Sequence, residues 1–136
     1  MDKKTAKLEA NYSYDLDRLG EEMNLVLEVS PGQTIEFHGM DQAASTGASW
    51  DYQVIDIETG LEIMDIVENV KVDYEPPASG LIGGHGTKIF LFTLGQNQTE
   101  NNGIKRFRID FKIIPSWDHQ GGFENPRAAY EFILGN

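Results

Sequence analysis

The side chains that could do chemistry are few and scattered. His38, His85 and His119 stand in separate segments, without the HExxH or i, i+4 spacing that brings two imidazoles onto one metal ion. No pattern resembles a nucleophile elbow, and a Ser-His-Asp group would have to be assembled by the fold without local support. The chain has no cysteine, hence no thiolate for catalysis, metal binding or a disulfide. The sequence therefore predicts no enzyme, no catalytic residue, no metal site and no cofactor.

Acidic residues set the charge of the surface. The chain has 22 Asp and Glu against 11 Lys and Arg, a formal net charge of -11. Pairs such as Asp15 with Asp17 are interpreted as a solvated acidic face, because the DxDxDG pattern of a calcium loop is missing. This charge would repel a polyanion, so we expect no nucleic-acid partner. We also expect no membrane insertion, because the longest apolar runs, such as residues 89–94, are too short to cross a bilayer.

The elements that must position any site are β-strands. Apolar residues recur with the two-residue period of a strand that has one buried face, most clearly in residues 105–114, where Phe107, Ile109 and Phe111 face inward and Arg108 and Asp110 outward. The expected strands are residues 25–29, 33–37, 50–54, 70–74, 88–94, 105–114 and 129–134. About seven to eight short strands with frequent turns predict an all-β, immunoglobulin-like, two-sheet antiparallel β-sandwich.

The connections predict two hairpins and a separate N-terminal arm. Ser30-Pro31-Gly32 predicts a turn that pairs residues 25–29 with 33–37, and Asn102-Gly103 predicts one that pairs 88–94 with 105–114. Residues 1–21 are expected to form an arm, partly disordered, and residues 22–136 the sandwich domain. With 136 residues the chain is expected to hold one domain and to be a monomer when free.

The sequence does not determine the cellular compartment. Met1–Thr5 leads into a polar stretch rather than into the apolar core of a signal peptide. The protein is therefore expected to be cytoplasmic, unless a leader was removed, in which case it is expected to be secreted, periplasmic or vesicular. Asn11 and Asn97 each begin an N-glycosylation sequon, which matters only in a eukaryotic secretory pathway.

Three connecting segments are candidates for binding another molecule, because their compositions differ from those of ordinary polar loops. Residues 41–50 run through small side chains to Trp50, and small side chains let a backbone approach another molecule closely. In residues 75–87, Pro76-Pro77 precedes four glycines around the apolar pair Leu81-Ile82. Residues 113–123 hold Trp117, a residue type enriched at the centre of protein interfaces.

Each segment also has a structural interpretation that needs no partner. The first could be a flexible connection, Leu81 and Ile82 could plug the end of the sandwich, and Trp117 could cover the core. Trp50 is expected to be a core residue rather than a contact. The glycine-rich segment matches neither phosphate-loop pattern and leads into a strand, so phosphate binding is not indicated.

Together these segments resemble the chagasin family, inhibitors of papain-like cysteine proteases. That family has an immunoglobulin-like sandwich with three loops at one end, in the order NPTTGYxW, a glycine-rich loop after Pro-Pro, and RPW. Here the first loop keeps Thr46, Gly47 and Trp50, and the third keeps Trp117. The second is the closest match in spacing, apolar pair and trailing Thr87. The resemblance extends over residues 22–134.

The sequence departs from the family pattern in two of the loops. Ala43-Ala44 replaces the stiff Asn-Pro of the first loop, and Ala48 replaces its aromatic residue. In the third loop Pro115 and Ser116 replace the Arg and the Pro. A less preorganised first loop and the loss of a charged donor predict weaker or differently targeted inhibition.

The resemblance implies a reversible, tight-binding inhibitor that blocks the active-site cleft of a papain-like, cathepsin-type protease. Residues 45–47 would lie beside the catalytic cysteine and histidine, with the other two loops against the flanks of the cleft. The alternative is a binding or adhesion module of the same descent that inhibits no protease. The expected protease-binding residues are Ser45, Thr46, Gly47, Ala48, Leu81, Ile82, Gly83, Gly84, His85, Gly86, Pro115, Ser116 and Trp117.

Overall fold

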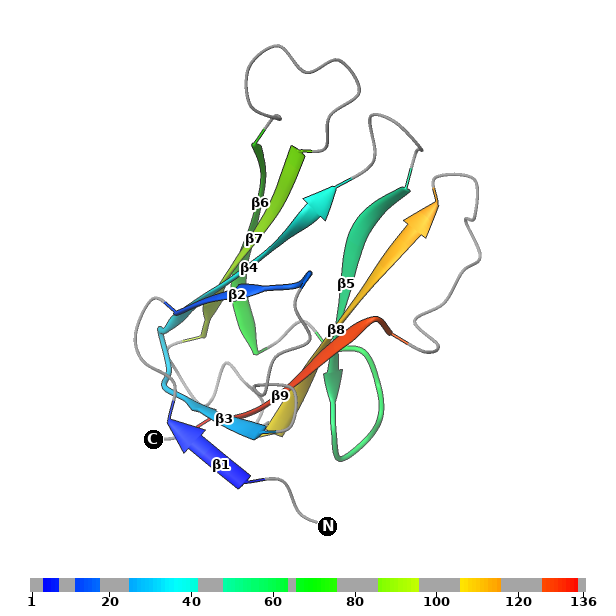
Figure 1. Cartoon of the computed structure of the whole chain (residues 1–136). Helices are drawn as coiled ribbons and strands as arrows, with labels where there is room; N and C mark the ends of the chain where they lie inside the picture. The colour runs from blue at the N-terminus through cyan, green and yellow to red at the C-terminus, as the bar shows by residue number, and fades with distance from the viewer. Residues whose placement is uncertain are drawn as a thin grey trace.

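The computed structural model describes residues 4–7, 12–17, 25–41, 48–63, 66–75, 86–95, 106–115 and 126–134. These residues form nine strands in two sheets and no helix, which confirms the predicted all-β, two-sheet sandwich (Figure 1). The immunoglobulin-like type of sandwich stays a prediction. The strands are β1 (Lys4–Lys7), β2 (Tyr12–Asp15), β3 (Leu25–Val29), β4 (Thr34–Asp41), β5 (Ala48–Asp56), β6 (Val67–Glu75), β7 (Gly86–Leu94), β8 (Arg106–Pro115) and β9 (Ala128–Leu134).

The two sheets mix antiparallel and parallel pairs. One sheet has the order β1-β3-β9-β8-β5 and the other the order β2-β4-β7-β6. The neighbours β5–β8, β8–β9, β4–β7 and β6–β7 are antiparallel, as expected. The pairs β1–β3, β2–β4 and β3–β9 are parallel, which the antiparallel prediction missed. Parallel strands cannot be joined by a tight turn, so the sequence has no local turn pattern from which this pairing could be predicted.

The N-terminal residues expected to form a separate arm contribute to both sheets. β1 adds to the five-stranded sheet beside β3, and β2 adds to the four-stranded sheet beside β4. Leu16, directly after β2, is fully buried in the core, and its backbone N–H donates to the His38 carbonyl oxygen at 2.7 Å. The described part of residues 1–21 therefore belongs to the sandwich.

Both predicted hairpins are instead connections between the sheets. β3 and β4 lie in different sheets although only four residues separate them, and β7 and β8 likewise lie in different sheets. The turn at Ser30-Pro31-Gly32 does form: Gly32 has a φ of 80°, and the Gln33 N–H donates to the Ser30 carbonyl oxygen at 3.1 Å. Proline followed by a residue with positive φ is typical of a type II turn, which can lead a chain into the facing sheet as well as into a neighbouring strand.

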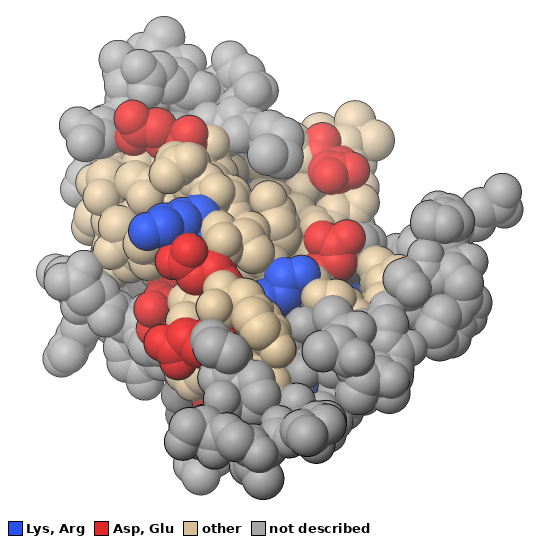
Figure 2. All heavy atoms as spheres, turned by 90° about the horizontal axis from the view of Figure 1, so that it is seen from above, with Lys and Arg blue, Asp and Glu red and all other residues tan. Residues whose placement is uncertain are grey.

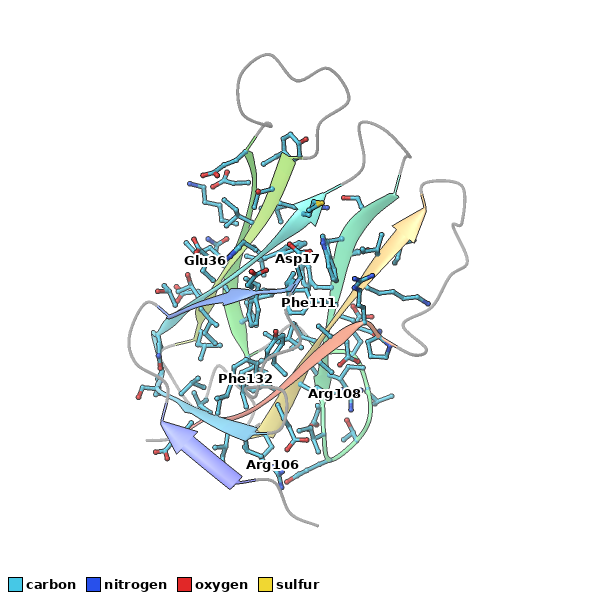
Figure 3. All side chains as sticks on the ribbon, in the orientation of Figure 1. Asp17, Glu36, Arg106, Arg108, Phe111 and Phe132 are labelled. Atoms are coloured by element: carbon cyan, nitrogen blue, oxygen red, sulfur yellow. The ribbon has the colours of Figure 1, made fainter. Side chains whose placement is uncertain are left out.

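An aromatic core joins the sheets. Phe37 of β4 packs against Phe111, Tyr130 and Phe132 of the opposite sheet, with ring centroids 4.6, 5.1 and 6.4 Å away. Phe111 and Phe132 lie between the two layers in Figure 3. The inward side of β8 is as predicted, because Phe107, Ile109 and Phe111 are fully buried. These aromatic side chains form part of one hydrophobic core between the two sheets.

The outward side of β8 differs from the prediction at one position. Asp110 faces outward but is only 1% exposed. Arg108, two residues away on the same face, donates to both carboxylate oxygens, at 2.6 Å from Nε and 3.0 Å from Nη2. The hydrogen bonding of the guanidinium to Asp110, which accepts from it, is the main reason that the pKa of Arg108 is raised above its ordinary value, and burial acts in the opposite direction.

Candidate functional site

The strand ends that flank the three candidate segments lie at one end of the sandwich. In the four-stranded sheet, β4 ends at Asp41 opposite Gly86, where β7 begins, and β6 ends at Glu75 opposite Thr87. In the five-stranded sheet, β5 begins at Ala48 opposite Pro115, where β8 ends. These ends point the same way, toward the top of Figure 1. Residues 42–47, 76–85 and 116–125 therefore all connect to strands at this end, which we name the loop end.

Three of the expected protease-binding residues lie within the described part of the chain: Ala48, Gly86 and Pro115. Ala48 and Pro115 are register partners, so the first and third segments start from adjacent points of one sheet. The other ten lie outside the described residues: Ser45, Thr46, Gly47, Leu81, Ile82, Gly83, Gly84, His85, Ser116 and Trp117.

Gly86 has a packing role that the sequence did not indicate. It is buried, and a Cβ atom added there would meet the Tyr74 hydroxyl and would lie 2.6 Å from the Glu75 carbonyl oxygen. Tyr74 is half-exposed at the end of β6. Glycine at position 86 therefore lets the end of β6 approach the start of β7 closely, at the base of the second segment.

Trp50 lies beneath the loop end and is 1% exposed, which confirms it as a core residue. Its indole Nε1–H donates to the Met40 carbonyl oxygen at 2.9 Å, which ties the start of β5 to the end of β4. The Met40 N–H donates in turn to Asp17 Oδ2 at 2.8 Å. The Arg127 guanidinium lies 5.9 Å from the centre of the Trp50 ring, within the range of a cation–π contact. Trp50 thus contacts Met40, which precedes the first segment, and Arg127, which follows the third.

The indole of Trp50 fits only because residue 39 is glycine. A Cβ atom at Gly39 would lie 2.6 Å from Trp50 Nε1 and 3.1 Å from Leu16 Cβ. We expect Gly39→Ala to lower the free energy of unfolding by about 1–3 kcal/mol, because the indole must move. Denaturant unfolding measures the loss.

A double-mutant cycle identifies the cause of that loss. Phenylalanine is smaller than tryptophan and is not held by a hydrogen bond to Met40, so its ring can move away from residue 39, and Gly39→Ala should cost less in a Trp50→Phe background than in the original protein. An equal cost in both backgrounds would show that the close approach to Trp50 is not responsible.

Lys88 forms a second tie between the sheets at the loop end. Its Nζ donates to Ser49 Oγ at 2.8 Å and to the Trp50 carbonyl oxygen at 2.7 Å, both on β5. It also lies 5.4 Å from the centre of the Phe90 ring. The sequence analysis did not single out Lys88. The available signal was that this lysine lies near the start of β7, in alternation with the inward-facing Phe90 and Phe92.

The described surface near the loop end includes exposed acidic side chains beside exposed apolar ones such as Val72. Asp51, Asp73 and Glu75 are exposed, and Lys71 is 3.5 Å from Asp73 on β6. Viewed from this end, acidic side chains occupy several separate places with lysine or arginine between them (Figure 2). Tyr52, on β5, has a raised pKa, first because of its burial and then because of the negative charges of Asp51 and Glu62.

Comparison with protein-family models found no match, and comparison with curated proteins found none. Among solved structures, the chain is similar to that of PbICP-C in complex with falcipain-2. The two share 11% identity over 96% of this chain and 97% of that chain, with a TM-score of 0.43.

The described residues show no arrangement for metal chemistry or for crossing a membrane with a helix. Within them, no three His, Cys, Asp or Glu side chains gather closely enough to hold a metal ion. None of their elements is a helix long and apolar enough to span a bilayer. What the described geometry offers is one end of the sandwich at which the strands that flank the three candidate segments all end or begin.

Proposed function

We propose that this protein is a reversible inhibitor of papain-like cysteine proteases that blocks the active-site cleft with the three candidate segments, through residues 45–48, 81–86 and 115–117. The observation that carries the proposal is the common position of the strand ends that flank these three segments. The resemblance of the same segments to the loops of the chagasin family names the target class. Three segments on one end of a rigid sandwich can enter a cleft together.

The proposed mechanism is steric and needs no chemistry from the inhibitor. Residues 45–47 occupy the place of a substrate beside the catalytic cysteine and histidine, without presenting a peptide carbonyl in attack geometry, so nothing is cleaved. The other two segments contact the flanks of the cleft. An interface of about 1,600 Å² would be of standard size. Trp117, Leu81 and Ile82 are the proposed energetic centre, because large apolar side chains in desolvated pockets contribute most to such interfaces.

The proposal is tested by titrating papain and a cathepsin-L-like protease with this protein. We expect stoichiometric inhibition without cleavage of the inhibitor. Trp117→Ala is expected to weaken the affinity by about 2 kcal/mol, the size of an interface hot spot. A Gly83→Ala/Gly84→Ala double variant should also weaken it, because both residues belong to the proposed second contact.

Two outcomes would reject the proposal. One is full protease activity at micromolar concentrations of the folded protein. The other is binding that persists when the protease cleft is already blocked by a covalent active-site ligand, which would favour the binding or adhesion module instead.

A further inference from the structure

The bases of the three proposed binding segments are joined through one small group of side chains. Trp50 donates a hydrogen bond to Met40, which precedes the first segment, and its ring lies beside the guanidinium of Arg127, which follows the third segment. Lys88 stands two residues after Gly86, where the second segment rejoins its sheet. Its ammonium bonds to Ser49 and Trp50, just after the first segment. We name Trp50 and Lys88 the anchor residues of the loop end.

Both anchor residues make a polar contact between the sheets, and that of Lys88 comes from a charged group. It is the register partner of Gly39 on one side and of Tyr74 on the other, so it projects from the middle of the four-stranded sheet. The two oxygens that accept its hydrogen bonds belong to β5, an edge strand of the five-stranded sheet. Hydrogen bonds from an ammonium are stronger than those between neutral groups. Lys88 therefore holds the edge of one sheet against the centre of the other.

We propose that Lys88 is a positioning residue. It fixes the positions of the first and second binding segments relative to each other in the free protein, before a protease binds. This inference rests on the proposed function. Inhibition requires the segments to enter one cleft together, so only molecules with the segments correctly spaced can bind. When a binding-competent arrangement is only partly populated, the apparent affinity falls by that fraction. Ordering the segments in advance removes this loss.

The test compares Lys88→Met with Lys71→Met. Methionine keeps the length and apolar stem of lysine but cannot donate to Ser49 or Trp50. Lys71 lies on the neighbouring strand β6, where its side chain is 64% exposed, so its replacement removes the same charge without touching β5. Association and dissociation rates with papain are measured at a temperature at which thermal unfolding shows that all the variants are folded.

The expected result is a fall in the association rate of Lys88→Met of about tenfold, which corresponds to a competent fraction of about one tenth. The dissociation rate should stay close to that of the original protein, because Lys88 itself touches no protease in the proposed complex. Loss of a direct contact would instead raise the dissociation rate. Lys71→Met should change neither rate by a comparable factor. Equal association rates for the two variants would overturn the proposal, as would a change confined to dissociation.

Hydrogen exchange of the free protein gives a readout that does not depend on inhibition. In Lys88→Met, backbone amides in peptides that contain residues 41–50 should exchange faster, while in Lys71→Met they should not. Unchanged exchange in Lys88→Met would overturn the positioning role. If the original protein fails to inhibit any papain-like protease, the proposed function fails, and the exchange experiment still decides whether Lys88 orders the loop end.

Discussion

Arg108→Met is expected to lower the free energy of unfolding by about 3–5 kcal/mol, because it leaves a buried carboxylate without its partner. Asp110 is 1% exposed, and Arg108 donates to both of its oxygens. The side chain of Arg108 is itself 38% exposed, so the guanidinium shields the carboxylate from water while remaining in contact with solvent. Removing it costs far more than the pair contributes, since the carboxylate cannot recover its hydration without opening the sheet.

A second arginine on the same strand is a matched control. Arg106 Nη2 donates to Glu131 Oε2 at 2.9 Å, but this pair is more exposed, at 46% and 17% of the side chains. We expect Arg106→Met to cost about 0–1 kcal/mol, as for other surface ion pairs. Adding Asp110→Asn to Arg108→Met should recover part of the lost stability by removing the buried charge. Denaturant unfolding of the four proteins measures these differences, and equal losses for the two arginine variants would contradict the argument.

The strands could be predicted from the sequence because side-chain alternation is a local property. Seven of the nine described strands correspond to predicted ones, with differences of a few residues at their ends. Their pairing could not be predicted in the same way. Residues 25–29 and 33–37 alternate correctly, yet nothing in the pattern or in the Pro31-Gly32 turn says that β3 and β4 join different sheets. β1 was missed because Lys4–Lys7 has no apolar alternation and pairs in parallel with a distant strand.

The candidate site shows the same division between local and distant information. The three segments were found from their composition and from a family resemblance, both of which can be read along the chain. The contact between Lys88 and β5 was not found, because it joins residues 38 and 39 positions apart in the chain. Asp110 was expected in solvent for a related reason: alternation predicts which face a side chain takes, but not that a neighbouring arginine lies across it.

Trp50→Ala is expected to be the most damaging change at the loop end, lowering the free energy of unfolding by about 3–5 kcal/mol. The indole is one of the largest fully buried side chains, and its removal leaves a cavity between the sheets. It also frees the Met40 carbonyl oxygen and removes the ring beneath Arg127. Calorimetry or denaturant unfolding measures the loss.

Two further variants separate packing from hydrogen bonding at Trp50. Trp50→Phe retains most of the buried apolar area but has no N–H for Met40, so its cost should be smaller, about 1–3 kcal/mol. Val72→Ala, at a residue 49% exposed on β6, should cost less than about 1 kcal/mol. A Trp50→Ala loss as small as that of Val72→Ala would mean that the loop end is held by its backbone strands alone. The expected order, with Trp50→Ala largest and Val72→Ala smallest, follows if Trp50 connects both sheets beneath the proposed binding segments.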